Sequence, residues 1–197
     1  MLLDEQLYQN WLLQLQTWAA DGRLVSAGVD ALRLQPGQAT EQLKRIANRL
    51  AKGETRDLPP VEMLPGSAMP GAAGAFAQAT GTIYINQDWL QASNTREIVN
   101  VLTEEYGHYL DNQLNKTDTA GDEGAVFAEQ LLAADNNGLL SQKNKHLLEK
   151  DDHGYINVNG QLLAAEFAVF HGTAGNDNIT GTLVTDCLLY TSPSPRD

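Results

Sequence analysis

The sequence has very little cysteine and few basic residues. Cys187 is the only cysteine among 197 residues, so a disulfide within the chain is excluded. A lone cysteine usually indicates a reducing compartment, although some secreted bacterial proteins also avoid cysteine. Lys and Arg together number 13 against 25 Asp and Glu, which gives a formal charge of −12. So acidic a surface repels phosphate backbones, which argues against nucleic acid as a partner and favours divalent cations.

The sequence also lacks a long apolar run. No stretch approaches the roughly 18 apolar residues that a membrane span needs, so none is expected. The first residues, "MLLDEQLYQNWLLQLQ", carry no basic segment, and polar residues interrupt their apolar ones, so we expect no cleavable signal peptide. Hydrophobic residues make up 42% of the chain, which is enough to fill a core and argues against disorder.

Apolar residues recur at helical spacing in several segments. This pattern predicts amphipathic helices over residues 3–19 and 38–52. A helix over about 95–115 follows a capping signal, since Asn or Thr precedes a glutamate in its first turn. Further helices are expected at "AVFAEQLLAA" (125–134) and "LSQKNKHLLEK" (140–150).

Strand signals are fewer and shorter. Residues 53–75 are rich in Pro, Gly and Ala, which predicts an irregular connection with one short strand at "VEML". β-Branched and aromatic residues predict a second strand in "GTIYIN" (81–86). "YINV", "NG" and "QLLAAEF" (155–167) are typical of a hairpin, since Asn-Gly is the strongest two-residue turn signal. The predicted fold class is α+β and mainly helical.

The segment "LTEEYGHYLD" (102–111) concentrates the candidate chemistry on the helix predicted over 95–115. Glu104, His108 and Asp111 share one face at positions i, i+4 and i+7. The spacing is that of the zinc-peptidase motif His-Glu-x-x-His with its first histidine replaced by Glu104. Glu104 and His108 would be ligands, Glu105 would be the general base, and Asp111 would orient His108 or bind the metal itself.

A third ligand has to come from downstream. "DTAGDEGAVFAE" offers Glu123 and Glu129. Glu129 better fits the ligand spacing of glutamate-ligand zinc peptidases, whereas Glu123 in "GDEG" is typical of a residue placed at a helix start, so both stay candidates. Zinc is one candidate, but two carboxylates and one imidazole form a harder donor set that also suits Mn, Fe or Ca.

Two other interpretations of this segment stay open from the sequence. The acidic residues could form a solvated helix face around a structural histidine. Glu105-x-x-His108 is also the spacing of carboxylate-bridged di-iron sites, which need a second Glu-x-x-His. None of the other three histidines has a glutamate three residues before it, so the di-iron interpretation is weak.

The motif and its surroundings resemble zinc peptidases of the zincin class. In that class a strand like "GTIYIN" runs over the active-site cleft, and a short loop leads to the motif helix. "LTEEYGHYLD…DTAGDEGAVFAE" also resembles a segment of large bacterial RTX (repeat-in-toxin) proteins, over about residues 74–186. That resemblance implies that Glu104 is a family feature, and it carries no established activity.

"GTAGNDNIT" (172–180) matches the nine-residue calcium repeat Gly-Gly-x-Gly-x-Asp-x-(apolar)-x, with Thr in place of the second glycine. Gly172 and Gly175 allow the tight turns, and Asp177 offers a hard anionic ligand for Ca²⁺. A partial second copy follows in phase, with Asp186 at the ligand position. These repeats resemble the parallel β-roll of RTX proteins, and the resemblance implies export by type I secretion with a C-terminal signal.

The last eleven residues, "CLLYTSPSPRD", resemble a translated transposase sequencing adapter, and we interpret residues 187–197 as an artefactual tail. The expected organisation is a helical segment (1–55), a zincin-like unit (56–168) and the start of a calcium-binding β-roll (169–186). Two functions remain open. One is a secreted metal-dependent hydrolase acting on a protein or peptide, and the other is a non-catalytic calcium-binding surface or adhesion protein.

Overall fold

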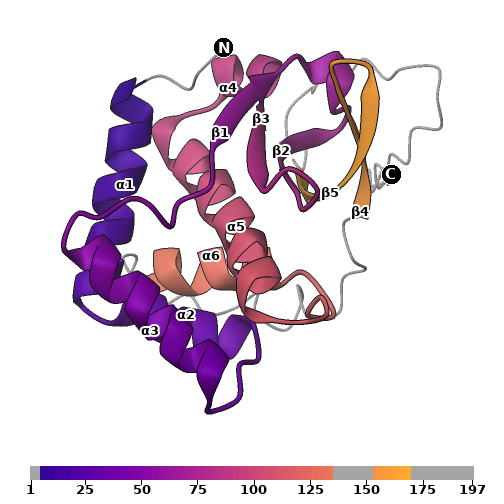
Figure 1. The fold of residues 1–197 in the computed structure, drawn as a ribbon. Coiled ribbons are helices and arrows are strands. Elements are labelled where there is room, and N and C mark those ends of the chain that lie inside the picture. Colours follow the sequence, from indigo (N-terminus) through magenta and orange to yellow (C-terminus); the bar gives the residue numbers. More distant parts are fainter. Residues whose placement is uncertain (1–4, 135–152, 170–197) are drawn as a thin grey trace, which may run out of the picture.

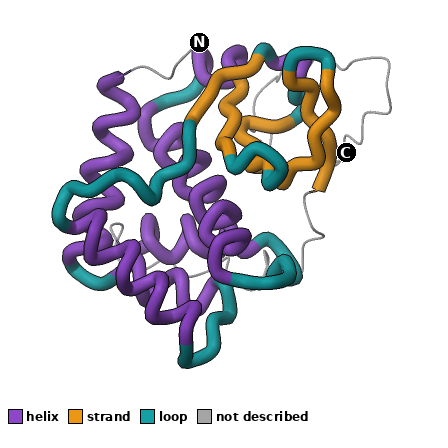
Figure 2. Tube along the Cα trace, in the orientation of Figure 1, coloured by secondary structure: helices purple, strands orange, loops and turns teal. Residues whose placement is uncertain are grey.

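The computed structural model describes residues 5–134 and 153–169. Helices and strands occupy different parts of the molecule, with the sheet at one end and most helices at the other (Figures 1 and 2). Together they form an α+β fold with more helix than strand, as the sequence predicted. The predicted helix over 140–150, the calcium repeat and the tail lie outside the described residues.

Three helices form the N-terminal part of the fold: α1 (Glu5–Ala20), α2 (Arg23–Ala31) and α3 (Gln38–Ala51). α1 and α3 match the predicted segments closely. Gly22 separates α1 from α2 in a left-handed conformation with φ 86°, which a residue without a Cβ adopts at little cost. The sequence analysis placed a break at this glycine but predicted no helix after it.

The motif lies on α5 (Thr95–Leu114), whose start matches the capping signal. The side chain of Asn94 accepts from the backbone of Glu97, and the Glu97 side chain accepts from the backbone of Asn94. This reciprocal capping box fixes where the helix begins and therefore which residues share a face. A short helix, α4 (Gln87–Ala92), precedes it, and α6 (Glu123–Ala134) follows it.

The five-stranded sheet has the order β1-β3-β2-β5-β4. Its strands are β1 (Val61–Leu64), β2 (Ala72–Ala77), β3 (Thr82–Asn86), β4 (His153–Val158) and β5 (Gln161–Val169). β1 runs parallel to β3, and the other neighbours are antiparallel. The sheet therefore joins three strands from before α5 with a hairpin from after α6.

The β4–β5 hairpin confirms the Asn-Gly prediction. Asn159 and Gly160 both have positive φ, at 52° and 87°, as a two-residue turn of the primed type requires. Residues 72–75, predicted to be irregular, instead belong to β2. Its sequence, "AAGAFA", has little intrinsic strand preference, and it is held by pairing with β3 and β5 on both sides.

The position of β3 differs from what the zincin resemblance implied. That resemblance placed the strand "GTIYIN" over the motif helix at a cleft. In the structure β3 lies inside the sheet between β1 and β2, so neither of its edges is open within the described residues. The strands that contact the motif residues are β2 and β5, through Gly74, Glu166 and Ala168.

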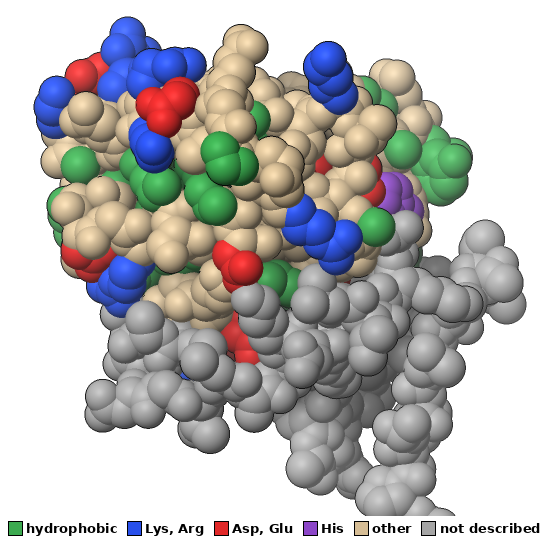
Figure 3. Space-filling view, turned by 90° about the horizontal axis from the view of Figure 1, so that it is seen from below, with side chains coloured by type: hydrophobic (Ala, Val, Ile, Leu, Met, Phe, Trp, Pro, Cys, Tyr) green, Lys and Arg blue, Asp and Glu red, His purple; other side chains and the backbone are tan. Residues whose placement is uncertain are grey.

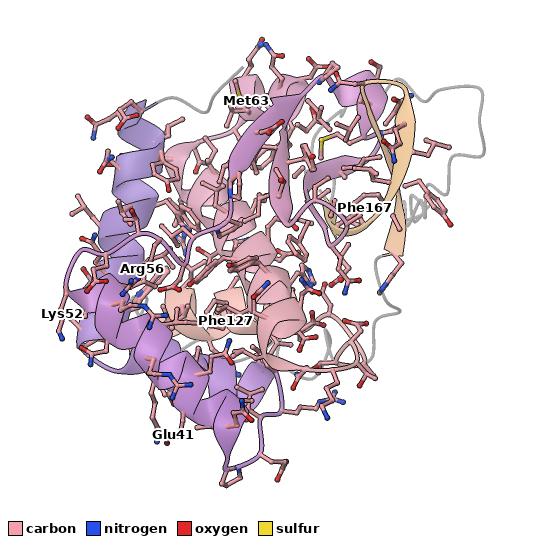
Figure 4. The ribbon with its side chains drawn as sticks, viewed as in Figure 1. Glu41, Lys52, Arg56, Met63, Phe127 and Phe167 are labelled. Carbon is pink, nitrogen blue, oxygen red and sulfur yellow. The ribbon has the colours of Figure 1, made fainter. Side chains whose placement is uncertain are left out.

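One continuous core joins the N-terminal helices to α5, α6 and one face of the sheet. Trp11 on α1 is fully buried and meets Tyr106 on α5 edge-to-face, with ring centroids 5.9 Å apart. Its indole N–H donates to the hydroxyl of Thr103 at 3.3 Å. Figure 4 shows Phe127 within this helical part and Phe167 on the hairpin side of the sheet, where a smaller second cluster packs. In the described part of the chain, no helix has the length and apolar character needed to cross a membrane.

Candidate metal centre

The acidic residues of the motif are buried. Glu104, Glu105, His108 and Asp111 expose 9%, 0%, 3% and 2% of their surface. This burial contradicts the interpretation of the motif as a solvated helix face. Buried ionisable groups need hydrogen bonds, opposite charges or a metal ion, so each side chain has to be accounted for.

His108 lies at the centre of the cluster, between α6 and β5. Its Nδ1 is 2.8 Å from Oε1 of Glu123, the first residue of α6. The same nitrogen is 2.6 Å from Oε2 of Glu166 on β5. Two carboxylates from different elements therefore converge on one ring nitrogen and fix the orientation of the imidazole.

The other ring nitrogen, Nε2, is buried and makes no hydrogen bond in the structure. It lies 3.9 Å from Oδ1 of Asp122, which precedes α6 and accepts the backbone N–H of Ala125. Glu104, His108 and Asp122 can each offer a ligand atom such that all three atoms lie within 4.8 Å of one another. An unpaired imidazole nitrogen facing two carboxylates has the donor chemistry of a divalent-metal site.

Two glycines allow α5 and α6 to pack closely beside Nε2. α5 and α6 approach so closely that a Cβ on Gly107 would lie 2.8 Å from the Cα of Gly124. A Cβ on Gly124 would collide with Nε2 of His108 and with the backbone oxygen of Glu104. The absent side chain of Gly124 therefore lets the backbone of α6 pack directly against the histidine, where any other residue would collide with the ring.

The second group that could hold an ion consists of His108, Glu123 and Glu166. It uses the Nδ1 side of the ring, where the hydrogen bonds are. The Nε2 side fits a metal better, because there the nitrogen lacks a partner. On that assignment Glu104, His108 and Asp122 would be the ligands, and Glu123 and Glu166 would hold the Nδ1 proton, as carboxylates do behind many metal-bound histidines.

The ionisation of the cluster follows from its burial. Burial alone would lower the pKa of His108, but the hydrogen bonds and charges of Glu123 and Glu166 hold it well above its usual value. Burial raises the pKa of Glu123 to about 7, although the bond to His108 opposes this. Burial also acts to raise the pKa of Glu166, but its contact with His108 is stronger and keeps the pKa low.

Glu105 faces the sheet. Its Oε1 accepts the backbone N–H of Ala168 on β5 at 2.8 Å, and its side chain packs against Gly74 on β2. Its Oε2 is buried without a hydrogen bond. Burial raises the pKa of Glu105 to about 8, although the nearby charge of His108 acts against this. The side chain links the motif helix to the strand that carries Glu166.

The other predicted ligands have different surroundings. Asp111 accepts from the backbone and the hydroxyl of Thr119 and from the amide of Asn115, so it anchors the loop after α5. It could share an ion with Asp118 and Glu123, but not with His108. Glu129 lies further along α6 and belongs to none of the described ion-binding groups.

Sequence reasoning missed Asp122 and Glu166. Asp122 is adjacent to Glu123 in "GDEG", where the sequence analysis considered only the glutamate. Glu166 is a charged residue inside the apolar strand "QLLAAEFAV", on the face that meets α5. A charge at an inward position of a strand was the available signal. The predicted calcium ligands, Gly172, Gly175, Asp177 and Asp186, lie outside the described residues.

A pocket of about 260 Å³ lies next to the cluster. Its walls come from β2 and the turn after it, and from the β4–β5 hairpin. The lining residues are Phe76, Gln78, Ala79, His153, Ala164, Ala165 and Glu166. Glu166 also contacts His108, so one carboxylate separates the pocket from the histidine. No family model, curated protein or solved structure matches this chain.

Proposed function

We propose that this chain binds one divalent transition-metal ion through Nε2 of His108 and the carboxylates of Glu104 and Asp122. The observation that carries the proposal is the buried Nε2, which has no hydrogen bond and faces two carboxylates beside a glycine. One imidazole and two carboxylates suit Zn, Mn or Fe. Glu104 and His108 occupy the two ligand positions of the zincin-like motif, and Asp122 takes the place that the sequence analysis gave to Glu123 or Glu129.

We propose further that the centre serves a peptidase-like hydrolase. A metal ion in such a site polarises a carbonyl and lowers the pKa of bound water. Glu105, in its ionised form, is our candidate for the proton acceptor, since it is adjacent to Glu104 and one of its oxygens has no hydrogen bond. Through Ala168 it also holds β5 in place, and with it Glu166 behind His108. The pocket lined by Glu166 provides the nearby space for substrate.

The wider context of the proposal is a secreted RTX-type protein. It rests on the nine-residue repeat with Gly172, Gly175, Asp177 and the in-phase Asp186, which we propose to bind Ca²⁺ once neighbouring turns are present. Divalent cations are then the partners of both parts of the chain. The charge of −12 is compatible with that role.

A second function is favoured by the closure of the site. Glu104, His108 and Asp122 are all at least nine-tenths buried, whereas catalytic metal sites keep one position open to water or substrate. A closed site suits a metal that stabilises the fold. On this alternative the chain is a non-catalytic calcium-binding surface or adhesion protein that carries a zincin-like module.

Metal analysis of the purified full chain tests whether the site binds a metal ion. Together with a cleavage assay, it distinguishes the hydrolase from the structural metal site. We expect one equivalent of transition metal in the parent protein and in His153→Ala, whose histidine is exposed, and none in folded His108→Ala. Metal-dependent cleavage of unstructured peptides, lost in Glu105→Gln with the metal retained, supports the hydrolase. Retained metal that raises the melting temperature without any cleavage supports the structural role. Equal metal content in His108→Ala and the parent overturns both.

A further inference from the structure

The pocket beside the cluster has a distinct chemical character. Phe76, Glu166 and His153 lie directly opposite one another on β2, β5 and β4, and therefore form one row across the sheet. Alanines from both sides complete the walls, so the lining is mostly apolar. Among the described residues that line it, Glu166 is the only acidic one, and none is Lys or Arg.

The surroundings of the pocket add an aromatic side chain and a further acid. Tyr155 is 69% exposed and pairs directly with Ala164 of the pocket wall, so the two residues are neighbours on the same face of the hairpin. Asp118 approaches the outer side of His153, with its Oδ2 3.8 Å from Nε2. In the space-filling view, an exposed histidine lies close to acidic side chains and to a group of hydrophobic ones at one edge of the molecule (Figure 3).

These features match one class of ligand. An aliphatic stem needs apolar walls, and a positive head group needs an acid, here Glu166, whose negative charge is shared with His108. An aromatic ring near the opening attracts a cation. A volume of about 260 Å³ has room for one long side chain. Small alanine walls leave that volume free, and the turn that carries Gln78 is held in place by its hydrogen bond to Asn112 on α5.

We propose that this pocket binds the side chain of an arginine or lysine residue in a peptide, with its head group toward Glu166 and its stem against Phe76 and Ala164. The substrate of the proposed hydrolase would then be a basic peptide segment. The identity of the substrate rests on the proposed function, whereas binding of a basic side chain in this pocket does not depend on it.

The test measures binding, so that it does not depend on the metal. Fluorescence anisotropy of the full chain in EDTA, at physiological salt, would compare a labelled pentapeptide containing arginine with the same peptide containing citrulline. The two side chains have the same shape, and only arginine is charged. We expect about tenfold tighter binding of the arginine peptide, since a charge-assisted hydrogen bond is worth about one decade of affinity.

Two substitutions on β5 test whether the preference for the arginine peptide arises in this pocket. Ala164→Arg places a competing cation inside the pocket and should abolish the preference for arginine over citrulline. Leu162→Arg is the matched control: it adds the same charge to the same strand face at a residue that does not line the pocket, and the preference should change less than about twofold after screening. Circular dichroism would check that both variants fold.

Three outcomes would overturn the inference. One is equal binding of the two peptides by the parent chain. Another is a preference for arginine that survives Ala164→Arg in the folded variant. The third is binding of agmatine, which carries the head group without a peptide, as tightly as the arginine peptide, because the ligand would then be a small amine. If the metal or cleavage is absent while the preference for arginine persists, the proposed function fails and this binding site remains.

Discussion

At the scale of single residues, the central feature is a histidine with carboxylates at both ring nitrogens. Nδ1 of His108 meets Glu123 and Glu166, whereas Nε2 faces Glu104 and Asp122 without a hydrogen bond. In a neutral imidazole one nitrogen carries the proton and the other donates a lone pair. When the imidazole is neutral, as metal binding requires, the acids on the Nδ1 side accept its proton, and the lone pair is then on Nε2, beside the backbone of Gly124.

This division of roles predicts unequal effects for two adjacent acids. Glu123→Gln keeps a hydrogen-bond acceptor behind Nδ1, and we expect it to weaken metal binding by about 10- to 100-fold, as losses of supporting carboxylates do. Asp122→Asn removes a ligand charge and should weaken binding more. Glu129→Gln, six residues along α6, is the matched control and should have no effect. Competition titration with a metal indicator measures all three, and a larger loss in Glu123→Gln would place the metal on the Nδ1 side.

Glu105 makes the stability of the metal-free protein depend on pH. Its folded pKa of about 8 lies above the 4.5 of an exposed glutamate, so between these values the folded state holds a proton that the unfolded state has lost. Stability therefore falls as pH rises through this window, by at most about 1.4 kcal/mol per unit. The raised pKa values of Glu123 and His108 act in the same direction.

Replacement of Glu105 by Gln should flatten this dependence. The amide oxygen can still accept from Ala168, and no charge has to be buried at alkaline pH. We expect Glu105→Gln to match the parent near pH 5 and to be clearly more stable near pH 8. Urea unfolding at both pH values, in EDTA, measures the difference. The assignment fails if the variant is less stable than the parent at pH 8.

At the scale of elements, the α5–α6 contact determines the geometry of the site. Gly107 and Gly124 let the two helices approach until the imidazole on one lies against the backbone of the other. α6 begins with Glu123, directly after Asp122, so the first turn of one helix supplies two acids to the histidine of its neighbour. A small displacement of α6 would move both acids away together.

Gly124→Ala tests this close approach. In a helix, alanine is ordinarily about 1 kcal/mol more favourable than glycine, so an unconstrained position would gain stability. Here the new methyl group collides with His108, and we expect a loss of about 1–3 kcal/mol together with weaker metal binding. Gly28→Ala is the comparison, because the added methyl group meets only the flexible end of Leu43. Equal stability changes in the two variants would contradict the tight α5–α6 contact.

The same elements show what the sequence could and could not predict. The motif helix was predictable, because its cap and its apolar face are local signals, and so was the hairpin from its Asn-Gly turn. β2 was not predictable from its own residues, because "AAGAFA" becomes a strand only by pairing with β3, which follows it, and with the distant β5. The same distance hid Glu166, which lies 58 positions after His108 and meets it only because β5 pairs with β2.

At the scale of the whole molecule, the N-terminal helices and the site share one hydrophobic core. Buried residues of α1, α2 and α3 belong to the same cluster as those of α5, α6 and the sheet. Hydrogen bonds also cross between these parts, from Trp11 to Thr103 and from Gln130 to Asp30. The helices before residue 55 therefore support the motif helix from the side opposite to the sheet.

Because the hydrophobic core is continuous, we expect a substitution far from the metal centre to unfold the centre as well. Trp11 is fully buried, packs on Tyr106 and donates to Thr103, so we expect Trp11→Ala to cost about 3–5 kcal/mol. Leu13 is on the same helix and 60% exposed, and Leu13→Ala should stay within about 0.5 kcal/mol of the parent. Urea unfolding followed by circular dichroism and by metal release should give one coincident transition, shifted only in Trp11→Ala. If metal release keeps its midpoint while the helical signal shifts, the N-terminal helices fold separately from the site.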